Sequence, residues 1–116
     1  MTRRFVIFDR FDTVVVPFPF AEQAVLKRRP VVVMSSRTFN AANGATLVAM
    51  ITTAKASIWP SDIALSDLAS AGLNTPCILR WRLTTLPNDL ILRVLGRLCP
   101  IDRMACERGM AEMVLG

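Results

Sequence analysis

Three adjacent cationic side chains, Lys27, Arg28 and Arg29, stand immediately before a proline and a run of valines. Their like charges repel one another, and a bound anion would relieve that repulsion. Pro30 restricts the residue before it to extended conformations, so it limits where the guanidinium of Arg29 points. The run therefore predicts an anion-binding site, and a solvated charged loop is the alternative interpretation of the same residues.

The residue types that are missing narrow the chemistry. The chain has no histidine, which excludes imidazole acid–base pairs and histidine-activated nucleophiles. Its three cysteines are an odd number without a Cys-x-x-Cys pair, so we expect free thiols and neither a zinc site nor a disulfide framework. An enzyme built from these residues must work by charge stabilisation, without a metal or other cofactor. RNA suits this limitation because its own 2′-hydroxyl is the nucleophile.

The excess positive charge is confined to the first half of the chain. The net charge is +5 and the pI is about 10.1. Residues 1–55 hold eight basic and three acidic side chains, whereas residues 56–116 hold six of each. Twelve of the 14 basic residues are arginine, which suits bidentate contact with phosphate. A nucleic acid or an acidic protein is therefore the expected partner.

The apolar content is high for a chain of this length. Hydrophobic residues make up 53% of the 116 residues, and the mean hydropathy is +0.42. We expect a single domain, 1–116, and a domain of this size buries only about two thirds of its surface. Unbroken apolar runs such as residues 47–51 are far shorter than the ~20 residues of a membrane helix. We therefore expect a homodimer, located in the cytoplasm and not in a membrane.

The hydrophobic pattern predicts a mainly β chain that ends in a single helix. Pro30 is expected to open the second strand, and Pro100 the helix. The expected strands are residues 13–16, 31–35, 46–53, 62–65, 78–85 and 90–98, with a turn at 40–44 and a helical turn at 66–72. The expected packing stripe of the helix is Ile101, Met104, Ala105, Ala111 and Leu115. Short strands followed by one helix favour a small, strongly curved barrel.

Several short segments, taken in order, resemble one known family. They are residues 14–20, 27–33, 50–53, 59–62, 67–73, 79–86 and 95–98. Together these segments resemble the MazF/PemK toxins over about residues 9–114, which is nearly the whole chain. The resemblance implies an SH3-like barrel of the MazF/PemK/CcdB type. One departure is Phe11, which stands where many members of the family carry glycine before the first-strand aspartate, so the geometry of the first turn is in question.

The resemblance also implies a catalytic pair, Arg29 and Thr52. Arg29 would stabilise the charged phosphorane and assist the leaving 5′-oxygen, and Thr52 would donate its hydroxyl to a nonbridging oxygen. Glu22 is the candidate acceptor of the 2′-hydroxyl proton. The candidate RNA-binding residues are Lys27, Arg28, Thr53, Arg80 and Arg82. The alternative interpretation of Arg80 and Arg82 is that they are solvated side chains on one face of a strand. Trp59 and Trp81 are expected either to stack on bases or to pack in the core or a dimer interface.

The function implied by the resemblance is that of the toxin in a type II toxin–antitoxin system. Such a toxin would be a metal-independent endoribonuclease that cuts single-stranded RNA, with mRNA as the expected target, leaves 2′,3′-cyclic phosphate and 5′-hydroxyl ends, and so inhibits translation and growth. Its expected partners are RNA, a second copy of itself and an acidic, partly disordered antitoxin that occupies the RNA groove. The alternatives are a CcdB-like toxin that binds DNA gyrase without catalysis, and a degenerate module that only binds antitoxin.

Overall fold

The computed structural model describes residues 6–18, 27–53 and 58–116. Its elements, in chain order, are β1 (Asp12–Phe18), β2 (Lys27–Val33), α1 (Arg37–Asn43), β3 (Ala45–Thr53), β4 (Ile63–Ala64), β5 (Cys77–Pro87), the 3-10 helix η1 (Asn88–Leu90), β6 (Arg93–Arg97) and α2 (Pro100–Leu115). Runs of β-branched valine explain why β1 and β2 form strands, since these side chains pack well on a pleated surface.

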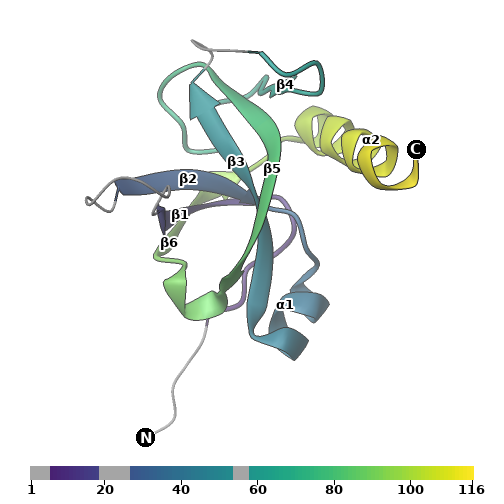
Figure 1. Cartoon of the computed structure of the whole chain (residues 1–116). Helices are drawn as coiled ribbons and strands as arrows, with labels where there is room; N and C mark the ends of the chain where they lie inside the picture. The colour runs from purple at the N-terminus through teal and green to yellow at the C-terminus, as the bar shows by residue number, and fades with distance from the viewer. Residues whose placement is uncertain (1–5, 19–26, 54–57) are drawn as a thin grey trace, which may run out of the picture.

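The strands form one antiparallel sheet in the order β4-β5-β3-β2-β1-β6. The sheet curls strongly, so that β1, β2 and β6 run across β3 and β5 in Figure 1. Irregularities in the register at Thr13/Val14 and at Ala49/Met50 accompany the bending. This curled half-barrel with a C-terminal helix confirms the fold class expected from the sequence.

Side chains pack against both faces of the curled sheet. One core contains Val32, Ile51, Leu79 and Trp81, and α2 covers it with Cys106 and Met110. The other core contains the alternate residues of the same strands, including Val31, Val33 and Val48. Because successive residues of a strand point to opposite faces, neighbouring positions belong to different cores. Any residue on these strands can therefore be assigned to a face from its position.

Helix α1 corrects the expected turn at 40–44 and the expectation of a single helix. Ser36 caps its N-terminus by accepting a hydrogen bond from the backbone N–H of Phe39, and Gly44 ends it with a left-handed φ of 64°. A buried polar network holds the helix: the Nδ2 atom of Asn40 donates to the Phe8 carbonyl, and that of Asn88 donates to the Asn40 carbonyl. Periodicity of apolar residues missed α1 because its buried residue is an asparagine.

Helix α2 begins at Pro100, as expected, but packs through a different face from the predicted stripe. Ile101, Met104 and Leu115 are 71%, 61% and 83% exposed, whereas Asp102 and Cys106 are buried. The carboxylate of Asp102 accepts hydrogen bonds from the backbone N–H and the hydroxyl of Ser66, at 3.0 and 2.9 Å. These hydrogen bonds, together with small residues on the same face, determine which face of α2 packs against the core. The larger apolar side chains are left exposed to solvent.

Two expected strand boundaries also change. β2 begins at Lys27, so Pro30 lies inside the strand and pairs with Val15. The pairing of β2 with β3 starts only at Val31, so proline is tolerated at a position that has one partner strand. The expected strand 90–98 is shortened to Arg93–Arg97, because residues 88–90 form η1.

Phe11 combines a strained backbone with a buried ring. Its φ is 73°, a left-handed value that glycine adopts readily, and its side chain is 5% exposed within the core under α2. The backbone position explains why glycine is common there in the family that the sequence resembles. Its carbonyl accepts a hydrogen bond from the N–H of Leu98, which links the turn before β1 to the segment before α2.

Phe11→Gly is therefore expected to destabilise the protein less than Phe11→Ala. Both variants lose the buried ring, a loss of about 3–5 kcal/mol for Phe→Ala. Glycine also removes the backbone strain, although it raises the entropy of the unfolded chain. On balance the glycine variant should be more stable than the alanine variant by about 1 kcal/mol. Equilibrium unfolding in urea measures this difference. An alanine variant at least as stable as the glycine variant would contradict the strain argument.

Candidate functional site

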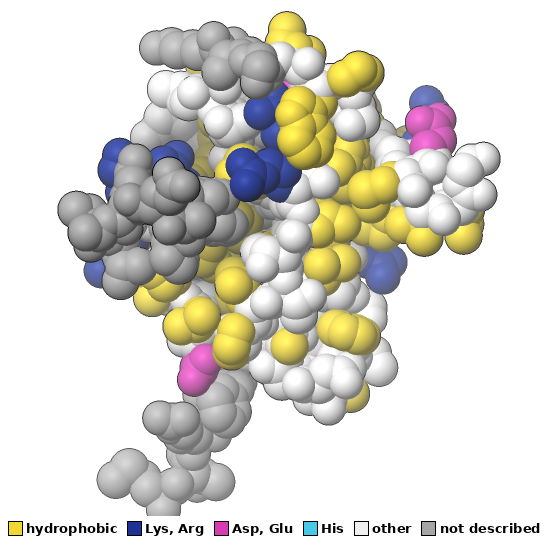
Figure 2. All heavy atoms as spheres, in the orientation of Figure 1, with side chains coloured by type: hydrophobic (Ala, Val, Ile, Leu, Met, Phe, Trp, Pro, Cys, Tyr) yellow, Lys and Arg dark blue, Asp and Glu magenta, His cyan; other side chains and the backbone are white. Residues whose placement is uncertain are grey.

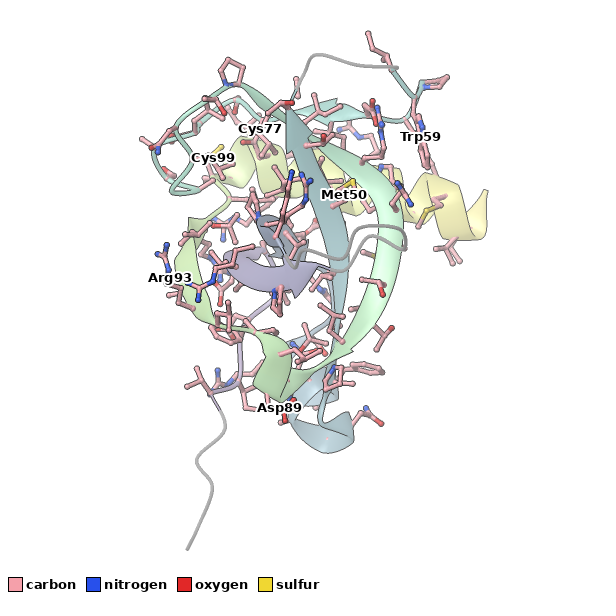
Figure 3. All side chains as sticks on the ribbon, turned by 60° about the vertical axis from the view of Figure 1, so that its left-hand side comes forward. Met50, Trp59, Cys77, Asp89, Arg93 and Cys99 are labelled. Carbon is pink, nitrogen blue, oxygen red and sulfur yellow. The ribbon has the colours of Figure 1, made fainter. Side chains whose placement is uncertain are left out.

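Arg29 and Thr52 lie on neighbouring strands, β2 and β3. β2 and β3 pair from Val33 with Val48 to Val31 with Met50, so Arg29 and Thr52 each lie two residues beyond the last pair. Strand alternation puts both on the face that carries Val31 and Met50, beyond the core that contains Val31. Figure 3 shows Met50 on β3 within this region. The fold thus brings together two residues that are 23 positions apart in the sequence.

Protein surrounds both side chains in part. Both residues are half-buried, and the Nε atom of Arg29 is shielded from solvent. The positions of Arg29 and Val16 are paired across β1 and β2, so Arg29 stands on a strand supported from one side by β1. A half-buried guanidinium beside a half-buried hydroxyl can contact one phosphate group with a cationic fork and a hydroxyl donor.

The other cations of the basic run lie at the beginning of β2. Lys27 and Arg28 are exposed and pair with Phe18 and Pro17 of β1. In Figure 2, Lys and Arg side chains gather at this end of β2 and again over the upper part of β3 and β5. Thr53, the last residue of β3, is exposed and pairs with Cys77. Glu22, the candidate proton acceptor, lies outside the described residues.

Arg80 is engaged in an ion pair with Asp62. Its Nε and Nη2 atoms donate to the two carboxylate oxygens of Asp62 at 3.0 and 2.9 Å, and the side chains are only 12% and 5% exposed. The Trp59 ring covers the same guanidinium, with Cζ 5.1 Å from the ring centroid. Arg82, two residues along β5, is exposed. Arg80 therefore presents its charge from a fixed position, whereas Arg82 stands at the surface.

The sequence did not predict that Asp62 and Trp59 contact Arg80 and hold its guanidinium in place. Asp62 also caps its own turn by accepting a hydrogen bond from the Trp59 backbone N–H at 2.9 Å. The carboxylate thus joins the turn before β4 to the face of β5. The sequence signal for this ion pair was an acidic residue near strands that carry arginines. Asp62 and Arg80 are 18 residues apart, so a local pattern did not connect them. Trp81 is buried in the core under α2, which agrees with the core alternative for that residue.

The pair with Arg80 should make stability depend on pH. The hydrogen bonds from Arg80 hold the pKa of Asp62 below its usual value of 3.8. The contribution of the ionised carboxylate is therefore complete above the unfolded-state pKa and is lost as the pH falls through the lower folded-state pKa. We expect Asp62→Asn to lower the Tm at neutral pH and to have a smaller effect at acidic pH, as the carboxylate becomes protonated in the folded state.

Thermal melting at the two pH values tests this expectation, with Asp89→Asn as the matched control. Asp89 is exposed in η1 and pairs with no cation among the described residues. A loss of Tm in Asp62→Asn that is as large in acid as at neutral pH would show that the ionised pair is not its cause.

The thiols and carboxylates do not gather into a metal-binding cluster in the part of the chain that the structure describes. Cys77, Cys99 and Cys106 are free. Burial raises the pKa of the Cys106 thiol to about 12, and the nearby carboxylates of Asp102 and Glu107 add to the effect. Such a thiol stays protonated and is a poor nucleophile. The helices that are described include none of the length and hydrophobicity needed to cross a membrane.

Comparison with protein-family models identifies the family of the chain. The family model described as the PemK-like, MazF-like toxin of type II toxin–antitoxin systems matches residues 9–114. The chain belongs to this toxin family. The match includes every described strand and all but the last residue of α2 of this toxin. A search of curated proteins finds no match to the toxin at the level of sequence.

Solved structures of similar fold agree with the family. Mycobacterium tuberculosis toxin MazF-mt6 superposes with a TM-score of 0.70 at 20% identity, covering 87% of this toxin and 93% of that chain. A MazE–MazF structure from Deinococcus radiodurans gives a TM-score of 0.73 at 18% identity, covering 94% and 97%. An endoribonuclease in complex with its cognate antitoxin, from a mycobacterial species, gives 0.69 at 16% identity, covering 90% and 91%. At these identities the likeness establishes the fold.

Proposed function

We propose that this toxin is an endoribonuclease that cuts single-stranded RNA, with mRNA as its target, without a metal ion. The observation that supports the proposal is that Arg29 and Thr52 lie on neighbouring strands and on one face of the sheet, each two residues beyond the pair Val31–Met50. The family fold supports it, because similar structures include proteins named as endoribonucleases. The exposed cations Lys27 and Arg28 beside this pair supply favourable electrostatics for a phosphate backbone.

In the proposed reaction the RNA supplies its own nucleophile. The 2′-oxygen attacks the adjacent phosphorus, the bond from phosphorus to the 5′-oxygen breaks, and the products are a 2′,3′-cyclic phosphate and a 5′-hydroxyl. The guanidinium of Arg29 stabilises the negative charge that grows on the phosphorane and on the leaving oxygen, while the Thr52 hydroxyl donates to a nonbridging oxygen. Glu22 is our candidate for accepting the 2′-hydroxyl proton.

We also propose two protein partners. An acidic, partly disordered antitoxin would compete with RNA for the cations of β2, and complexes with an antitoxin among the similar structures support such a partner. A second copy of the toxin would cover apolar side chains that the monomer leaves at its surface. Leu90, Leu92 and Val94 are 40%, 48% and 51% exposed along β6 and its approach, and β6 is an edge strand. A homodimer acting in the cytoplasm is the assembly we infer.

Cleavage is expected to persist in EDTA and to leave cyclic phosphate ends. The physical reason is that charge stabilisation comes from Arg29 and the nucleophile from the substrate, so neither task is left for a metal ion. Purified toxin is incubated with a long single-stranded RNA in EDTA, and the fragments are tested for 2′,3′-cyclic phosphate and 5′-hydroxyl termini. Cleavage that requires added magnesium, or that leaves 5′-phosphate ends, would contradict this mechanism.

A further inference from the structure

A groove runs along the side of α2, at the opposite end of β1 from Arg29. It consists of two adjoining hollows of about 500 and 350 Å³ that share Arg10, Phe11 and Glu107 in their walls. We call the first hollow the basic half and the second the apolar half of the α2 groove. Arg29 pairs with Val16, whereas the groove lies beside the segment just before Asp12. At about 3.3 Å per residue the two sites are separated by roughly 13 Å of strand.

Four arginines line the basic half: Arg10, Arg37, Arg97 and Arg103. Carboxylates offset only part of this charge. Arg97 pairs with Asp12 at 3.1 Å, and Arg37 approaches Asp9 at 3.8 Å with both side chains more than half exposed. Arg10 donates its Nε to the carbonyl of Met34 instead.

Arg103 forms no ion pair with any residue that the structure describes. Asp9 and Glu107 are the two acidic residues in the same wall, and Asp12 pairs with Arg97 from outside it, so one positive charge remains in excess. This half of the groove is complementary to carboxylates or phosphates.

The apolar half continues along the outer face of α2. Met110 packs against the core, whereas Val114 and Leu115 are 67% and 83% exposed. The C-terminal part of the helix projects beyond the sheet in Figure 1, so this face is open in the monomer. An apolar surface of this kind beside a basic one suits a ligand that carries apolar side chains next to its charges.

We propose that the α2 groove is a second docking site for the antitoxin, and that it takes a segment with carboxylates over the basic half and aliphatic or aromatic side chains over the apolar half. The antitoxin as the source of this segment rests on the proposed function. A peptide fits better than RNA, because the apolar half offers aliphatic side chains and no exposed aromatic ring for base stacking. Because the groove is separate from Arg29, a segment confined to it adds affinity without covering the catalytic pair.

The test uses labelled synthetic peptides with a glutamate-rich half and a half rich in leucine and phenylalanine, in both orders. Binding to the full-length toxin is followed by fluorescence anisotropy, and NMR maps the backbone signals that shift. We expect binding by at least one order, with shifts around Arg103, Glu107 and Val114. Arg103→Glu and Val114→Glu should each weaken binding by about tenfold. Val114 is well exposed, so its variant should keep the fold.

Arg93→Glu is the matched control, because Arg93 is exposed on β6 and lies away from α2 in Figure 3. It should change the affinity less than about twofold, since long-range surface charge is screened. The proposal is overturned if neither peptide binds, if Arg93→Glu weakens binding as much as Arg103→Glu, or if Arg103→Glu weakens binding of single-stranded RNA but not of peptide. RNA cleavage by the parent toxin is measured separately, so loss of the ribonuclease proposal and loss of this one are distinguishable.

Discussion

Arg29→Ala is expected to lower the rate of RNA cleavage by about 10²–10³-fold, or more, while the toxin remains folded. The guanidinium is the charged member of the Arg29–Thr52 pair, and it can meet both the phosphorane and the leaving oxygen with its fork of donors. Its loss removes charge stabilisation at the step where negative charge grows. Single-turnover cleavage of a fluorescent single-stranded RNA measures the effect, and thermal melting checks the fold.

Two further variants separate the role of Arg29 from general electrostatic attraction. Arg29→Lys keeps the charge but loses the planar fork, so it should recover only part of the rate. Arg108→Ala removes an exposed arginine from α2, which packs against the opposite face of the sheet from Arg29, and should cleave at the parental rate. If Arg29→Ala is folded and as active as Arg108→Ala, Arg29 does not take part in the chemistry.

Thr52→Val is expected to lower the cleavage rate by about 10²-fold, because it removes a hydroxyl donor while keeping a β-branched side chain of similar shape. Thr52→Ser keeps the donor and should stay close to the parental rate. The loss should appear in the rate of the bound complex more than in RNA affinity, since the hydroxyl is proposed to act on charge that develops in the transition state.

Thr85→Val provides the matched control for this substitution. Thr85 is an exposed threonine on β5, where it pairs with Leu47 at the other end of β3 from Thr52. The same loss of a hydroxyl there should leave cleavage unchanged. A Thr52→Val toxin with the parental rate and an unchanged melting curve would assign Thr52 a structural role only.

Local sequence patterns determined most of the strands and the start of the last helix. β1, β2, β3 and β5 contain valine, isoleucine, threonine and leucine in patterns that suit a strand wherever it lies. Pro100 is suited to the first turn of a helix because its missing N–H has no intrahelical acceptor there. These preferences act within a few residues, so they are visible without a fold. The order of the segments was enough to indicate the family.

Contacts between distant residues decided what the patterns could not. α1 depends on Asn88, whose side-chain amide donates to the Asn40 carbonyl across 48 residues, and no periodic pattern of apolar residues marks the helix. The face of α2 depends on Asp102, whose carboxylate is held by Ser66 across 36 residues. In the candidate site the sequence named Arg29 and Thr52 through the resemblance, but their placement on neighbouring strands required the pairing of β2 with β3.

Arg80 shows most clearly the difference between what local sequence patterns predict and what distant contacts decide. Its position on an alternating strand indicated a cation on one face of the sheet, which is a local property. Whether that cation is solvated or held depends on Asp62 and Trp59, which reach it only because the turn before β4 folds against β5. Taking both groups out of water costs free energy that their pairing must offset, and that loss of solvent is set by tertiary packing and by no neighbour in the sequence.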